Sequence, residues 1–199
     1  MGRIERMRAG GSAGNRQLTA LVAAILVLLL AIEGATLLRL GSLLTVHAFV
    51  GMLLIPIVAL KLASTGWRML RYYLGADEYT RHGPPPLLLR ALVAPVLIVS
   101  TVVLFATGTA LLVLDLTEGT LVGLHKASFI VWLGAAAVHV LAHASKLPRL
   151  LRTRAAGVGL RVALVVGAVA AGCVVAVATL PAADGLQDRA SAHVHLDRD

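Results

Sequence analysis

The chain alternates between long apolar runs and short polar connectors. Five runs are each long enough for a helix to cross a bilayer: residues 18–38, 43–65, 88–114, 121–148 and 162–180. They are continuous and lack the period of two that marks the strands of a membrane β-barrel. The pattern therefore predicts an all-α integral membrane protein, with a four-helix transmembrane bundle in residues 18–148 and a fifth transmembrane helix after it.

Composition supports the membrane assignment. The 199 residues are 58% hydrophobic with a mean hydropathy of +0.87, and only 14% are charged, whereas a soluble domain carries about a quarter charged residues. The net charge of +8 comes from basic residues that flank the apolar runs. Because they form no separate basic domain, we expect the lipid bilayer as a partner and no nucleic acid. The single cysteine, Cys173, excludes a CxxC metal site and covalent haem attachment.

The basic residues also predict the orientation. Thirteen Lys and Arg lie in the basic N-terminus (1–17), the connector before residue 91 and the segment 146–161, against three on the other side of the membrane. By the positive-inside rule the N-terminus is cytoplasmic and the C-terminus lies outside. We expect a multi-pass protein of a bacterial-type plasma (inner) membrane. Residues 149–180 then hold a basic connector and the fifth span, which we expect at the periphery of the bundle.

Histidines occur inside two of the apolar runs, where ionisable side chains are rare unless they have a function. With this orientation, runs 43–65 and 121–148 cross the membrane in the same direction. His47 and His125 lie near the start of these runs, so both imidazoles fall at similar depth near the outer face. Two such imidazoles are able to hold a haem iron from both sides. The alternative is that they only join helices through hydrogen bonds.

A second pair of positions repeats the spacing. His139 follows His125 by 14 residues, about 21 Å along a helix and nearly on the same face, and Lys61 follows His47 by the same interval. His143, 18 residues after His125, shares that face and lies closer to the inner headgroups. We therefore expect His139 rather than His143 as a ligand, and His143 as an interfacial or quinol-side residue.

This arrangement, with the segment HKASFIVWLGAAAVHVLAH, resembles the transmembrane b-type cytochromes, a superfamily that includes cytochrome b561 and the cytochrome subunits of nickel–iron hydrogenase and formate dehydrogenase. The resemblance covers residues 18–148. It implies haem b as cofactor, with His47, His125 and His139 as candidate iron ligands. In that family two haems stack within the bundle, and the second would need a histidine where this chain has Lys61.

Lys61 leaves three outcomes open at the inner site. The chain holds one haem, on His47 and His125; or two, with Lys61 as an unusual ligand opposite His139 or His143; or its inner site is a quinone pocket or a remnant. A ligating lysine must lose its proton, so we expect one haem rather than two. Lys61 otherwise snorkels to the interface or pairs with a haem propionate. Lys126 and Arg39 are further propionate partners, unless they too are only interfacial.

The sequence therefore predicts a membrane cytochrome that passes electrons between quinol or quinone and a redox partner subunit. It carries no GxGxxG fingerprint and no iron–sulfur cysteines, so it does not collect hydride by itself, and we assign no catalytic residue. Two alternatives stay open: a non-redox transporter or anchor subunit whose histidines bind protons or a metal, and a transmembrane ferric or cupric reductase. Homo-oligomers also stay open as partners.

Two polar features complete the candidates. Glu33, near the outer end of the first run, either handles quinol protons or pairs with Lys126. Residues 181–199 form a polar external tail with His193 and His195. Two histidines in a polar tail are more typical of a disordered segment than of a metal site, so we expect no helix there.

Overall fold

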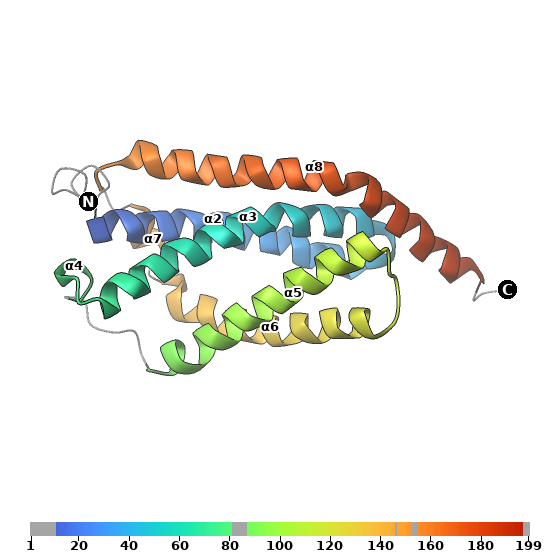
Figure 1. Ribbon diagram of the computed structural model, residues 1–199, viewed down its shortest axis with the longest axis horizontal. Helices are drawn as coiled ribbons and strands as arrows, with labels where there is room; N and C mark the ends of the chain where they lie inside the picture. Colours follow the sequence, from blue (N-terminus) through green and yellow to red (C-terminus); the bar gives the residue numbers. More distant parts are fainter. Residues whose placement is uncertain (1–10, 81–86, 146, 153–154, 197–199) are drawn as a thin grey trace.

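The computed structural model describes residues 11–80, 87–145, 147–152 and 155–196. The described chain is 92% helical and has no strand among the described residues, which confirms the predicted all-α class. The helices run lengthwise beside one another, with the chain's N-terminal end and C-terminal end at opposite ends of the bundle (Figure 1). Four helical stretches are long and apolar enough to cross a membrane: Gly11–Tyr73, Leu89–Leu114, Thr120–Ala144 and Val158–Ser191.

The first stretch contains two helices folded back on each other. Helix α2 (Gly11–Thr36) is followed by a 3₁₀ turn, η1 (Leu37–Arg39), and by α3 (Leu40–Tyr73). Arg39 and Leu43 have non-helical dihedral angles, so the chain reverses there. The Lys61 ammonium of α3 donates to the Thr19 carbonyl of α2 at 2.8 Å, which fixes the register of the antiparallel pair.

The second half is built from α5, α6 and α8. A π-helical turn, η2 (Leu89–Val93), leads into α5 (Ala94–Leu114), and a short turn joins α5 to α6 (Thr120–Ala144). Short helices α4 (Asp77–Thr80) and α7 (Leu147–Leu151) lie at the end of the bundle where α2 begins (Figure 1). The α2–α3 and α5–α6 turns lie together at the opposite end, which brings the starts of α3 and α6 to the same level.

Helix α8 (Val158–Leu196) lies at one edge of the bundle and packs mainly on α3, in the most extensive helix–helix contact of the described chain (Figure 1). The expected unstructured tail is wrong for residues 181–196, because the helix continues through Pro181. The Gln187 side chain explains part of this, since its Oε1 accepts from the Leu44 amide at 2.8 Å and its Nε2 donates to the Gly41 carbonyl at 2.6 Å.

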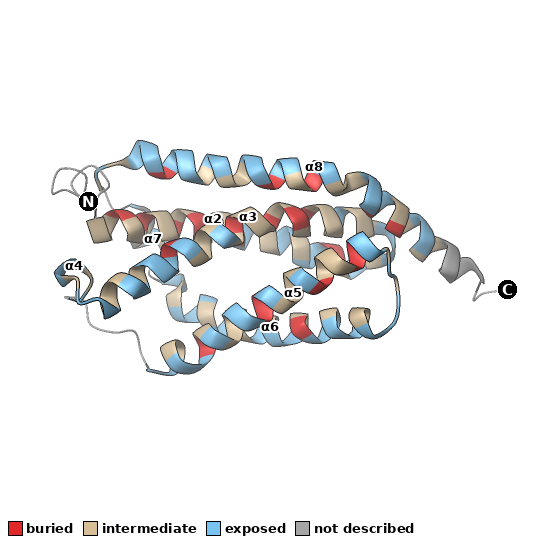
Figure 2. Ribbon diagram, viewed as in Figure 1, coloured by how far each residue is buried: buried red, intermediate tan, exposed pale blue. Residues whose placement is uncertain are grey.

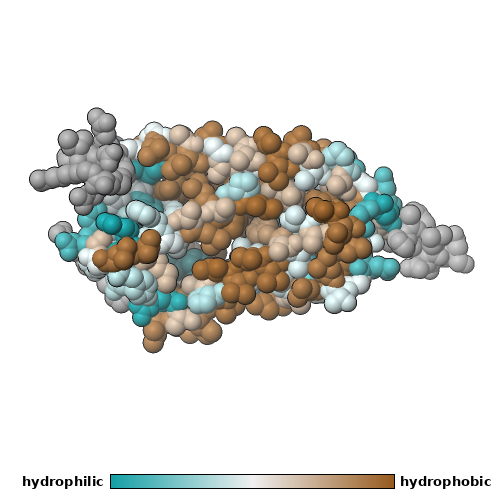
Figure 3. Space-filling view, viewed as in Figure 1, coloured by the Kyte–Doolittle hydropathy of each residue, from teal (hydrophilic) through white to brown (hydrophobic). Residues whose placement is uncertain are grey.

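The buried core lies where these helices meet. One cluster joins α2 to α3 through Val22, Leu26, Val50, Leu54 and Ile57. A second joins α3, α5 and α8 around Met52, Leu112 and Ala176. Most outward residues of α6 and α8 are exposed (Figure 2), and apolar side chains cover the middle of the surface between hydrophilic ends (Figure 3). This distribution is typical of a protein surrounded by lipid.

Candidate functional site

His47 is held at the start of α3 by two side chains from the end of α2. Its Nδ1 atom lies 3.0 Å from Glu33 Oε1 and 3.0 Å from Thr36 Oγ1. The Thr36 hydroxyl donates to the Glu33 carbonyl at 2.6 Å, so it accepts from the imidazole. Both partners are therefore acceptors, which assigns the proton to Nδ1 and leaves the Nε2 lone pair available. The His47 and Glu33 side chains are 21% and 16% exposed.

His125 is held in the same manner by α5. Its Nδ1 atom lies 3.0 Å from Thr107 Oγ1 and 3.2 Å from the Leu104 carbonyl oxygen. The Thr107 hydroxyl donates to the Val103 carbonyl at 2.7 Å, so here too the imidazole is the donor and Nε2 keeps its lone pair. The ring lies against Gly108, where an added Cβ would be 3.0 Å from His125 Cε1. Glycine at this position makes room for the imidazole.

The two imidazoles thus share one design. Each is fixed through Nδ1 by a buried threonine hydroxyl and a second acceptor, and each presents a free Nε2. His47 is close enough to His125 for their charges to interact. Their helices share little or no direct backbone packing within the described residues, since α3 packs on α2 and α8 and α6 packs on α5. A metal-binding imidazole usually has its other nitrogen held in this way.

Lys61, His139 and His143 lack the arrangement that His47 and His125 share. Lys61 donates to the Thr19 carbonyl of α2, and Thr19 Oγ1 lies 3.2 Å from Ser64 Oγ. His139 and His143 stack on each other with ring centroids 4.6 Å apart, and His143 Nδ1 donates to the His139 carbonyl at 2.9 Å. Lys61 is close enough to His139 to act on it electrostatically. The geometry gives Lys61 a helix-pairing role, which fits metal ligation poorly.

The remaining candidates make no contact with the histidines among the hydrogen bonds and ion pairs of the described residues. Arg39 and Lys126 are exposed, and neither side chain has a hydrogen bond or ion pair within the part of the chain that the structure describes. The suggested pairing of Glu33 with Lys126 is wrong, because Glu33 pairs with His47 instead. His193 and His195 belong to the last turns of α8, away from the bundle (Figure 1).

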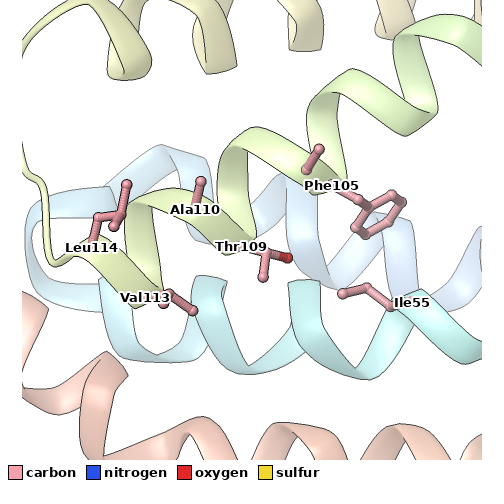
Figure 4. A pocket seen from close by; sticks show the side chains of 7 residues that line it. Ile55, Phe105, Thr109, Ala110, Val113 and Leu114 are labelled. Carbon is pink, nitrogen blue, oxygen red and sulfur yellow. The ribbon is translucent and has the colours of Figure 1, made fainter.

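An apolar groove lies elsewhere, between α3 and α5. It has a volume of about 550 Å³ and is lined by Ile55 from α3 and by α5 residues that include Phe105, Thr109 and Val113 (Figure 4). No histidine lines it, because these α5 side chains point away from the face that carries Thr107 and Gly108. The groove is therefore separate from the imidazole pair.

Sequence reasoning missed the residues that orient the imidazoles: Thr36, Thr107 and Gly108. Threonine and glycine are common in membrane helices, so neither stands out alone. A usable signal was the Thr107-Gly108 pair on the helix preceding His125, which offers an acceptor next to an open space. Trp132 was also missed; its Nε1 donates to Thr101 Oγ1 at 3.0 Å and ties α6 to α5.

Comparison with known proteins adds no assignment to this geometry. No family model matches the chain, and neither a curated protein nor a solved structure matches it significantly.

Proposed function

We propose that this chain is a membrane b-type cytochrome that binds one haem b between His47 and His125. The observation that carries the proposal is that two imidazoles, one on α3 and one on α6, are each fixed through Nδ1 by a buried threonine hydroxyl and are close enough for their charges to interact. The donor set fits a haem, because two neutral nitrogen ligands with oriented outer hydrogen bonds are what six-coordinate haem iron takes. When bound, the haem supplies reversible one-electron transfer.

The residues of the chain have separable tasks in this proposal. Thr36 and Thr107 fix the tautomer and the ring plane of the two imidazoles. Glu33 adds a negative charge next to His47, which makes that imidazole more electron-rich than His125, whose second acceptor is a neutral carbonyl. The apolar surface of the bundle keeps water away from the pair, which favours the neutral imidazole.

The inner pair supports one haem rather than two in this proposal. Lys61 is already engaged with α2, and His139 stacks on His143, so the two face different partners. His139, His143 and Lys61 are then left for a quinone or a haem propionate, with Lys126 and Arg39 as further propionate partners near the outer face. Electrons enter or leave by quinol or by a redox partner subunit, since the sequence offers no flavin or iron–sulfur site of its own.

The proposed topology has five spans, with α2 and α3 counted separately, a cytoplasmic N-terminus and an external C-terminus in a bacterial-type plasma membrane. Its support is that Arg16, Arg68 and Arg161 all lie toward the end of the bundle where α2 begins. That end is the basic, cytoplasmic side by the positive-inside rule.

The proposal is tested by a reduced-minus-oxidised absorption spectrum of the protein purified after expression with a haem supply. We expect a Soret and α-band shift in wild type and in His143→Ala, and its loss in His47→Ala and His125→Ala. A wild-type protein with no such shift contradicts the haem assignment. Vesicles that contain the haem-loaded protein are then assayed for two activities, reduction of external ferric or cupric ions and oxidation of quinol. The first activity indicates a metal reductase, and the second indicates a quinol-oxidising cytochrome.

A second candidate is proton handling without haem, and the half-buried Glu33–His47 pair favours it. Buried carboxylate–imidazole pairs inside a membrane are typical of proton pathways. Proton-dependent uptake or leak in haem-free vesicles, abolished by Glu33→Gln, would support this function. Vesicles as proton-tight as protein-free ones contradict it.

A further inference from the structure

Three cationic side chains gather at the end of the bundle where α2 begins and α3 ends. Lys61 and Arg68 are seven residues apart on α3, which places them on one face about 10 Å apart along the axis. The contact of Lys61 with Thr19 fixes the register of α2 against α3. Arg16, three residues before Thr19 on the antiparallel helix, therefore extends toward Arg68, and the two are close enough to interact electrostatically.

No carboxylate of the described residues forms an ion pair with Arg16 or Arg68. The Arg68 side chain is half-buried, has no hydrogen bond among the described residues, and lies close enough to Tyr79 for an electrostatic interaction. Among the described residues, the Arg16 side chain donates to Ser12 Oγ at 3.4 Å. The neighbouring carboxylate, Glu78, approaches the Ser12 amide at 3.4 Å and pairs with neither arginine. Like charges held this close repel each other, so the arrangement favours an anion.

A buried donor adds an independent sign of a ligand. The Asn15 amide nitrogen is fully buried and has no hydrogen-bond partner among the described residues. The Asn15 side chain points to Thr19, since its Oδ1 lies 3.4 Å from Thr19 Oγ1. It therefore faces the same α2–α3 contact as the cations. Buried polar groups without partners are rare and usually indicate a missing ligand or water.

The depth of the cluster points to the lipid headgroups. Trp67, Tyr72 and Tyr73 lie within five residues of Arg68 at the end of α3, and aromatic residues of this kind sit at the headgroup level of a membrane. Apolar side chains beside them are exposed, with Met69 at 51% and Leu70 at 52%. They offer a surface for acyl chains next to the arginines, which a soluble anion would not use.

We propose that Arg16 and Arg68 bind the phosphate group of an anionic phospholipid in the leaflet at this end of the bundle, beside the α2–α3 contact that Asn15 faces. The two guanidinium groups supply paired donors that match phosphate oxygens. Lys61, about two helical turns deeper, adds positive potential while it remains bonded to Thr19. The site is distinct from the imidazole pair and does not depend on the presence of haem.

The test is native mass spectrometry of the full chain in detergent, titrated with phosphatidylglycerol or with phosphatidylcholine. We expect wild type to retain phosphatidylglycerol in preference to phosphatidylcholine. Arg68→Gln and Arg16→Gln should each weaken phosphatidylglycerol binding about fivefold. Arg71→Gln is the matched control: its guanidinium carbon lies 5.9 Å from the Trp67 ring centroid at the same depth, so the affinity should stay within about twofold of wild type.

Three results would overturn the proposal. Equal retention of the two lipids by wild type removes the headgroup selectivity and needs no variant to fold. If Arg71→Gln loses as much phosphatidylglycerol affinity as Arg68→Gln, the binding depends on the general surface charge and not on a specific site. Displacement of phosphatidylglycerol by millimolar inorganic phosphate assigns the site to a free anion. Arg68→Lys serves where Arg68→Gln folds poorly, and it should keep part of the affinity because it keeps the charge.

Discussion

Gly172 allows the backbone of α8 to approach the backbone of α3. A Cβ added at Gly172 would lie 3.0 Å from Leu53 Cδ1, 3.2 Å from the Leu53 carbonyl carbon and closer still to its oxygen. The Leu53 side chain has room to rotate, but its carbonyl is fixed by the helix. Gly172→Ala therefore pushes the two helices apart along their most extensive contact.

The size of the effect follows from two opposing terms. Overpacking of this kind costs about 1–3 kcal/mol, and alanine regains about 0.5–1 kcal/mol through its better helix propensity. We expect a net loss of about 1–2 kcal/mol, which for a chain of this length lowers Tm by about 5 °C. The assay is thermal unfolding in detergent followed by circular dichroism.

Gly167→Ala is the matched control on the same helix. A Cβ added at Gly167 meets no atom within 4 Å, so only the propensity gain remains and Tm should stay constant or rise slightly. If Gly172→Ala proves as stable as Gly167→Ala, the close approach of α8 to α3 is refuted.

Three further substitutions test the imidazole pair and the C-terminal end of α8. Glu33→Gln removes a negative charge beside His47 and should raise the haem midpoint potential in a redox titration, by at most about 40 mV for a change of about 1 kcal/mol. Gly108→Ala crowds the His125 ring, stretches its bonds to α5, and should lower the haem content measured by pyridine haemochrome. Gln187→Ala removes three hydrogen bonds to the start of α3 and should speed amide exchange there, at a cost of about 1–2 kcal/mol.

Each of these substitutions has a control. Glu118→Gln removes an exposed carboxylate on the α5–α6 turn and should leave the potential unchanged. Gly123→Ala adds a methyl group in open space on the histidine helix, so haem content should stay constant. Asp188→Ala changes an exposed neighbour on α8 and should not alter exchange. A control that changes as much as its partner contradicts the corresponding interpretation.

The sequence predicted the helical class, and it predicted that His47 and His125 lie at a similar level, because both depend on local rules. Apolar runs define helices in a membrane, and the 14-residue interval defines a helix face. His47 lies close to His125, as the sequence predicted. That prediction needed only the direction of the two helices and the residue at which each one begins.

The partners of these histidines were harder to predict because they come from other helices. Whether Thr36 or Lys126 meets the pair depends on how the α2–α3 turn rotates α2, and hydropathy carries no such information. The continuation of α8 past Pro181 was missed for a related reason. The polar residues there are held by contacts with the start of α3 and by an Arg189–Asp115 ion pair, which only the folded chain creates.

The haem-to-protein ratio, measured by pyridine haemochrome on the purified full chain, tests the central claim most directly. We predict a ratio of about one in wild type, since one pair of imidazoles is oriented for a single iron, and a ratio near zero in His47→Ala. Lys61→His should raise the ratio only if the inner site is a disabled haem site. A wild-type ratio of about two contradicts the single-haem proposal, and a ratio of zero contradicts the cytochrome assignment itself.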